Sequence, residues 1–141
     1  MRRLFIMRKD LHMSTGKLLA QTCHCAEAYW TRKIHAGVEL VVDGKVIVNI
    51  EILKDEYFQY VSGTFTKTVC EARSKTHLLK AKTMADDMGL VEDVDYGMIY
   101  DKCLTELEPE EQDGTTLTGI WFKPLPDDQA HAISKKYQLY K

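Results

Sequence analysis

The chain has 141 residues, of which 45% are hydrophobic and 28% charged, and its formal net charge at pH 7 is −2. This length and balance exclude a disordered chain and fit one domain spanning residues 1–141. The charge is uneven, about +6 over residues 1–82 and −8 over residues 83–141. The small sum excludes nucleic-acid binding by bulk charge, whereas a local basic face in the first part stays open.

In chain order, the first predicted element is a buried strand at residues 4–7, where four apolar residues follow one another. After a turn, the hydroxyl residues Ser14 and Thr15 can cap a helix that runs from Lys17 to about Lys33. Residues 38–48 contain two β-branched runs joined by Asp-Gly, which is the strongest short signal of a β-hairpin.

Further elements alternate in the same way along the rest of the chain. The sequence predicts a short helix at 53–61, a strand at 66–72, a helix from the cap Ser74 to about Met88, strands at 96–101 and 115–123, and a closing helix at 127–136. This order favours an α/β fold with helices on both faces of a mostly parallel or mixed sheet. Sites in such sheets form in the loops beyond the C-terminal ends of the strands, which here are residues 8–17, 101–106 and the turn at Gly114-Thr115.

A narrow polar stripe runs along the first predicted helix. Lys17, Gln21 and His24 fall within about 60° of one another at the helical period of ~100° per residue. Lys17 lies in the first turn, where the helix dipole disfavours a cation, so an anionic ligand would explain it well. Together the three groups could hold a phosphate or polarise a carbonyl. The alternative is a solvated helix face with one hydrogen-bonded histidine.

Asp101 ends a predicted strand, a position that suits a general base or a group that orients a lysine. An isolated aspartate there is also a common turn former. Thr105 and Thr115 could supply hydroxyls nearby, although single threonines are first of all strand formers.

The four cysteines predict neither a metal site nor a disulfide framework. Cys23, His24 and Cys25 are neighbours on a helix and point about 100° apart, so they cannot all bind one metal or form a nucleophile pair. The N-terminal apolar run is too short for a signal peptide. We expect a reduced, cytoplasmic protein without a membrane anchor.

Residues 8–26 read Arg-Lys-Asp-Leu-His-Met-Ser-Thr-Gly-Lys-Leu-Leu-Ala-Gln-Thr-Cys-His-Cys-Ala. They resemble the opening motif of the type-2 peptidyl-tRNA hydrolase family, Arg-x-Asp-Leu-x-Met-x-x-Gly-Lys-x-x-Ala-Gln-x-x-His-x-Ala, at every fixed position. Later segments also resemble this family: its middle helix at 74–89, its Asp-Ala-Gly-Arg-Thr-Gln-Ile loop from Asp101, its Glu-Pro-Gly-Thr turn at Glu108-Pro109 and Gly114-Thr115, and its last strand and helix at 121–139.

The resemblance implies a three-layer fold with a four-stranded mixed sheet, usually dimeric, that hydrolyses the ester between a peptide and the 3′ ribose of tRNA without a cofactor. It implies that Lys17, Asp101, Thr105 and Thr115 form the catalytic group and that Gln21 and His24 belong to the same pocket. We expect water to attack the ester in a gap between Lys17 and Asp101. Charge alone suggests Arg8, Lys9 and Lys75 as contacts to tRNA phosphates.

Departures from the family pattern keep two other functions open. Cys103, Leu104 and Glu106 replace its Gly, Arg and Gln, an acidic insertion occupies 110–113, and the hairpin region at about 37–52 is extra. Losing an arginine and gaining carboxylates beside a polyanion weakens tRNA binding. The chain could therefore be a tRNA- or protein-binding module without turnover, or a hydrolase of non-RNA esters or amides.

Overall fold

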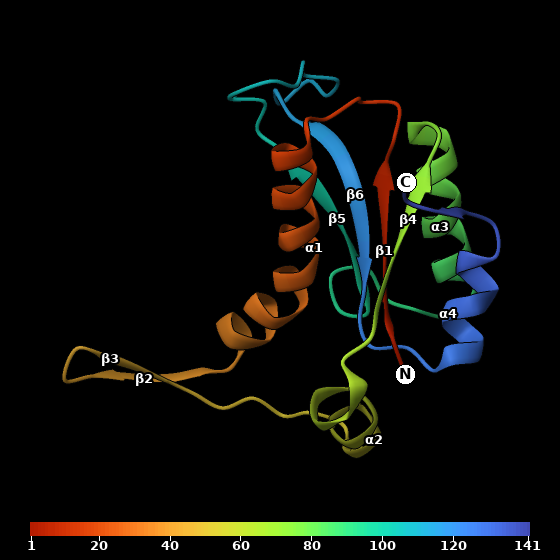
Figure 1. Cartoon of the computed structure of the whole chain (residues 1–141). Coiled ribbons are helices and arrows are strands. Elements are labelled where there is room, and N and C mark those ends of the chain that lie inside the picture. The colour runs from red at the N-terminus through yellow and green to blue at the C-terminus, as the bar shows by residue number, and fades with distance from the viewer.

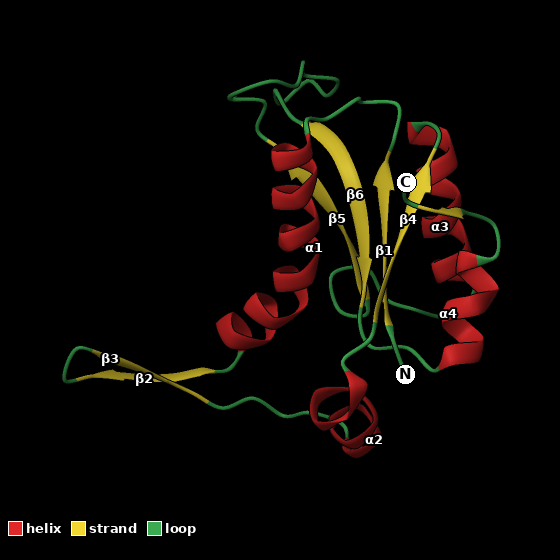
Figure 2. Ribbon diagram, in the orientation of Figure 1, coloured by secondary structure: helices red, strands yellow, loops and turns green.

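A computed structural model describes all 141 residues and has three layers, with a central sheet covered by helices on both faces (Figure 1). The helix α1 lies on one face, and α3 and α4 lie on the other (Figure 2). The main-sheet strands are β1 (Arg3–Arg8), β4 (Lys67–Ala72), β5 (Tyr96–Asp101), β6 (Thr116–Phe122) and β7 (Gln138–Leu139), and the helices are α1 (Thr15–Ala36), α2 (Lys54–Glu56), α3 (Lys75–Asp87) and α4 (Asp127–Ser134). The expected α/β fold is confirmed.

The main sheet is mixed and has the strand order β5-β6-β1-β4-β7. Only β1 and β4 pair in parallel, while the other neighbouring pairs are antiparallel. The four expected strands are all present, and the two-residue β7 adds a fifth at the edge beside β4. Strands β1, β4 and β5 run in the same direction and end at the same end of the sheet. The segments after Arg8, Ala72 and Asp101 therefore lie at one end of the molecule.

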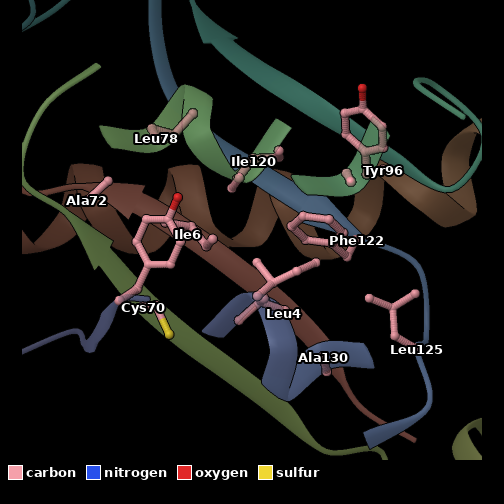
Figure 3. Packing of buried hydrophobic residues seen from close by; sticks show 14 of the residues in the cluster. Leu4, Ile6, Cys70, Ala72, Leu78, Tyr96, Ile120, Phe122, Leu125 and Ala130 are labelled. Carbon is pink, nitrogen blue, oxygen red and sulfur yellow. The ribbon is translucent and has the colours of Figure 1, made fainter. Parts of the chain in front are cut away.

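Buried side chains fill both sides of the sheet. Fifteen of them, including Leu4, Ile6 and Ile120, form the core between the sheet and the helices α3 and α4 (Figure 3). Phe5 and Met7 alternate with these residues along β1 and pack with Trp121 against α1. All six residues of β1 are buried, which explains its uninterrupted apolar run.

Serine residues cap the two helices, α1 and α3, that begin at this end of the sheet. The hydroxyl of Ser14 accepts a hydrogen bond from the backbone N–H of Lys17, and that of Ser74 accepts one from His77. Each cap satisfies a backbone donor that the first helical turn leaves free. Both expected caps are confirmed.

The expected hairpin is present as β2 (Val38–Val42) and β3 (Lys45–Val48), which form a separate two-stranded sheet that projects from the body (Figure 1). Its turn residues Asp43 and Gly44 both have positive φ, 51° and 71°, as a type I′ turn requires. At its base, Asn49 N–H donates a 2.8 Å hydrogen bond to the carbonyl oxygen of Gly37.

The segment after the hairpin is helical over a longer range than expected. The three-residue α2 continues into a π-helical stretch, η1 (Tyr57–Thr64). Phe65 then adopts a left-handed conformation, with a φ of 61°, that turns the chain into β4. None of the helices combines the length and apolar character that crossing a bilayer would need.

Candidate active site

A cleft of about 600 Å³ lies between the N-terminal half of α1 and the end of β5. The predicted site residues that line it are Lys17, Gln21 and His24 on the helix and Asp101 and Thr105 on the strand and its loop. Five of the eight predicted site residues thus lie in one cleft. The remaining lining residues are Met98, Ile99, Tyr100, Lys102 and Leu104.

The ammonium group of Lys17 and the carboxylate of Asp101 form an ion pair at the centre of this cleft. The Nζ–Oδ1 distance is 2.7 Å, and the two side chains are only 15% and 10% exposed. Lys17 Nζ also donates to the Thr105 hydroxyl over 3.3 Å. The expected ester-sized gap between the two charges is therefore wrong: opposite charges this far from water attract strongly enough to be in direct contact.

Gln21 connects this ion pair to the sheet. Its amide Nε2 donates a 3.1 Å hydrogen bond to Asp101 Oδ1, and its Oε1 accepts a 2.7 Å hydrogen bond from the hydroxyl of Thr118. Gln21 is 2% exposed and Thr118 is fully buried on β6. The buried amide is thus satisfied at both ends and has a defined orientation.

The backbone turn after Asp101 supplies a third donor. Cys103 has a φ of 57°, and its N–H donates a 3.0 Å hydrogen bond to Asp101 Oδ2. This is a side-chain turn of the type that aspartate favours, closed by a residue in the left-handed region. The left-handed conformation costs free energy for a non-glycine residue, and the hydrogen bond to Asp101 offsets that cost.

The Lys17–Asp101 pair keeps hydrogen-bonding positions that no other residue uses. A carboxylate has about four lone-pair positions, and three of those on Asp101 are taken by Lys17, Gln21 and the Cys103 N–H. An ammonium group has about three donors, and two of those on Lys17 go to Asp101 and Thr105. One acceptor on Oδ2 and one donor on Lys17 thus stay free in the same cleft.

Glu106 fastens the loop 102–106 to the start of α1. Its carboxylate accepts hydrogen bonds from the backbone N–H of Ser14 at 2.8 Å and from the Ser14 hydroxyl at 2.6 Å. These two bonds lower the pKa of Glu106 below its ordinary value. A carboxylate at a helix N-terminus is also favoured by the helix dipole. We call this contact the Ser14–Glu106 clasp.

Three predicted site residues lie outside the cleft lining. The Arg8 guanidinium is 4% exposed and pairs with Asp10 and Glu110, at 2.7 and 2.6 Å. Burial acts to lower the pKa of Arg8, but the hydrogen bonds and charges of those two carboxylates outweigh it and raise that pKa. Lys75 pairs with Glu111, and Thr115 donates to Asp113 over 2.6 Å.

Lys9 is likewise engaged, since its ammonium lies 3.6 Å from Glu71 and over the ring of Tyr140. The predicted acidic insertion thus has a structural use, because Glu110 and Glu111 pair with two of the three cations expected to face tRNA.

Sequence reasoning missed Thr118 and the clasp. Thr118 lies inside a strand, where a threonine is an ordinary strand former. Simple alternation would put it on the same face as Ile120 and Phe122, and only the register shift between β5 and β6 turns it toward α1. The clasp joins residues 92 positions apart, which no local pattern reveals.

The Cys23-His24-Cys25 stretch behaves as helix geometry predicts. Cys25 is buried against Met7, whereas Cys23 and His24 are exposed. Burial raises the pKa of the Cys25 thiol to about 12, which makes it a poor nucleophile. No three metal-binding side chains converge in the structure.

Two comparisons with known proteins bear on this cleft. A family model described as Peptidyl-tRNA hydrolase PTH2 matches residues 1–140. The chain is also 26% identical over 133 residues to a Thermoplasma acidophilum protein named peptidyl-tRNA hydrolase, covering 94% of this chain and 92% of that relative. The match with the family model spans every element around the cleft.

Proposed function

Because the chain belongs to the peptidyl-tRNA hydrolase PTH2 family, we propose that it hydrolyses peptidyl-tRNA at the Lys17–Asp101 cleft. The observation that carries this proposal is the pair itself: a free acceptor on Asp101 Oδ2 and a free donor on Lys17 face one cleft. Ester hydrolysis needs one group to hold and deprotonate water and one to stabilise the developing oxyanion. These two groups supply both.

In the proposed reaction, a water molecule bound to Asp101 Oδ2 attacks the ester carbonyl carbon while Lys17 donates a hydrogen bond to the carbonyl oxygen. Asp101 takes a proton from the water as the new C–O bond forms. The bond to the ribose oxygen then breaks, and Asp101 returns the proton to that oxygen. The products are a peptide with a free carboxylic acid, which loses its proton to water, and a tRNA with a free 3′ hydroxyl.

The other polar residues of the cleft would act around this pair. Gln21 and Thr105 hydrogen-bond to the Asp101 and Lys17 side chains, and the exposed His24, which lines the cleft, would contact the ester end of the substrate. Thr115 has no place in this proposal, because its hydroxyl bonds to Asp113. Arg8 and Lys75 are proposed to support the fold rather than to bind tRNA, since carboxylates already pair with both.

Hydrolysis is preferred over a binding module without turnover because the altered loop supports the proposed Lys17–Asp101 pair. Cys103 still closes the turn onto Asp101, and Glu106 still anchors the loop through the clasp. The substitutions in the loop thus leave the ion pair intact. The expected homodimer and cytoplasmic location stay predictions.

The test is the incubation of purified protein with peptidyl-tRNA, followed by separation of the charged and uncharged tRNA. We expect release of both free tRNA and intact peptide at a rate well above that of the Lys17→Ala variant, with similar far-UV circular dichroism of the two proteins. Binding of tRNA without release of peptide by the wild type would instead favour the binding module. Release of peptide at a rate that does not depend on salt would favour a non-RNA substrate.

A further inference from the structure

A second concave surface, the α3 pocket, lies on the opposite face of the sheet from the active-site cleft. It has a volume of about 520 Å³ and lies between one stripe of α3 and the chain just after α4. Its basic lining residues are Arg73, His77, Lys80 and Lys136, and Tyr137, Thr83 and Met84 complete it. No carboxylate lines this pocket.

The cations of the α3 pocket are free, unlike most others at this end of the molecule. Arg8, Lys9, Lys17 and Lys75 all form ion pairs with carboxylates. Three cations line the pocket, Arg73, Lys80 and Lys136. None of them forms an ion pair or donates a side-chain hydrogen bond in the structure. The pocket therefore holds positive charge that nothing in the chain neutralises.

The beginning of α3 adds to this positive potential. Its first turn contains no acidic residue, and Arg73, which has no ion-pair partner, precedes the cap Ser74. The helix dipole places a partial positive charge at the same end, so cations there lower stability in the absence of an anion. This unpaired positive charge at the start of α3 is better explained by an anionic ligand than by a contribution to folding stability.

The walls of the pocket are fixed by contacts within the chain. The His77 ring stacks on Tyr137 with 4.5 Å between centroids, and Tyr137 donates a 2.8 Å hydrogen bond to the His77 carbonyl oxygen. The His77 Nδ1 accepts from the Arg73 N–H, which leaves Nε2 to donate to the carbonyl oxygen of Lys136. These contacts hold the ring in place, and it joins the two walls of the pocket.

The location of the pocket suits a long polyanion that also reaches the cleft. Arg73 follows the end of β4, and Asp101 ends β5, three strands away at the same edge of the sheet. At ~4.8 Å between neighbouring strands the two strand ends are about 14 Å apart along the sheet, and the position of the pocket and the cleft on opposite faces adds to their separation. A nucleic acid duplex carries about one charge per 1.7 Å of its axis, so a tRNA arm with its end in the cleft presents many phosphates over such a distance.

We propose that the α3 pocket binds phosphates of the tRNA backbone and so positions the substrate while its ester end lies in the cleft. This inference rests on the proposed function for its ligand. The carboxylates of Glu110 and Glu111 already pair with Arg8 and Lys75, so the α3 pocket supplies cations that are not shared with a carboxylate.

The test compares two variants of equal charge. Lys80→Gln/Lys136→Gln removes two pocket cations, whereas the control Lys45→Gln/Lys54→Gln removes one from the hairpin and one from α2. Binding of fluorescent uncharged tRNA is followed by anisotropy over a series of salt concentrations. We expect the pocket variant to bind roughly tenfold or more weakly, with the slope of log K against log salt reduced by about two, and the control to match the wild type.

A kinetic readout separates this inference from the proposed function. With peptidyl-tRNA, the pocket variant should show a raised KM and an unchanged kcat, because the cleft is untouched. If the wild type binds tRNA through the pocket but releases no peptide, the proposed function fails and the inference stands. If the wild type hydrolyses peptidyl-tRNA while the pocket variant keeps its affinity, salt slope and KM, the inference is overturned.

Discussion

Thr118 on β6 donates a hydrogen bond of 2.7 Å to the amide oxygen of Gln21 on α1, a residue 97 positions earlier in the chain. The contact fixes the orientation of the amide, so that its nitrogen and not its oxygen faces Asp101. A reversed amide would place its oxygen against the carboxylate, and the two would repel. The geometry of the proposed active site thus depends on a buried hydroxyl that lies outside the cleft lining.

Thr118→Val should lower both stability and turnover. The buried Gln21 oxygen would lose its donor, and an unsatisfied buried acceptor costs about 1–3 kcal/mol of unfolding free energy. We expect that loss in urea denaturation and a several-fold lower kcat with peptidyl-tRNA, because Asp101 is held less firmly. Thr118→Ser keeps the hydroxyl and should retain kcat. Equal kcat values for Val and Ser variants would contradict a positioning role.

The clasp predicts different outcomes for two substitutions of Glu106. Glu106→Gln keeps an oxygen that can accept from Ser14, so it should retain most of the wild-type kcat. Glu106→Ala frees the loop that carries Thr105 and should lower kcat roughly tenfold or more, since small displacements of catalytic groups are costly. Steady-state kinetics on both variants decide this, and an Ala variant as active as the Gln variant would refute it.

The lowered pKa of Glu106 also sets the direction of a pH effect. A depressed folded-state pKa means that the clasp stabilises the protein fully above the unfolded value of about 4.3. That stabilisation is lost as the pH falls through the lower folded value. We expect the difference in Tm between the wild type and Glu106→Gln to be constant from about pH 5 to 8 and to shrink below about pH 4. Growth of the difference on acidification would show that another group dominates.

Arg8 should matter for folding and not for substrate binding. Arg8→Met leaves Asp10 and Glu110 without their cation, and breaking a buried ion pair costs about 3–5 kcal/mol. Because both carboxylates are about one third exposed, we expect a loss nearer 2 kcal/mol in urea denaturation. The KM for peptidyl-tRNA should change less than twofold at a temperature where the variant is folded. A large rise in KM with unchanged stability would restore Arg8 as a tRNA contact.

The hairpin should be dispensable for the proposed chemistry. Gly37 and Asn49 are already joined by a hydrogen bond at its base, so residues 38–48 can be replaced by a short glycine-containing turn. The deletion should keep the Tm within a few degrees and kcat within about twofold, since β2 and β3 pair only with each other. A large loss of kcat would show that the hairpin contributes to the site.

Much of the fold could be predicted because local signals and tertiary structure agree. The Ser14 and Ser74 caps, the Asp-Gly turn and the apolar run of β1 each lie where the sequence predicts them. The edge strand β7 could not be predicted, because two residues carry no alternation and are defined only by their pairing with β4. No sequence pattern predicts the π-helical stretch either.

For the site, helical spacing places Lys17, Gln21 and His24 on one stripe, and the end of a strand marks Asp101. The sequence could not show which charges neutralise one another. Arg8 and Lys75 look like free cations in the sequence, yet Glu110 and Glu111 bind them across more than 30 intervening residues. Such pairs form only when the fold brings distant segments together, and the same holds for the unpaired cations of the α3 pocket.

The most direct test of the account is a double-mutant cycle on the Lys17–Asp101 pair, measured as the rate of a single turnover of peptidyl-tRNA. Lys17→Ala and Asp101→Asn should each slow the chemical step by about 10²–10⁴-fold. The combined variant should be little slower than the worse single variant, because groups that act as a unit lose their effect together. Near-wild-type turnover by either single variant, with the fold intact by circular dichroism, would contradict the assignment of this ion pair as the catalytic centre.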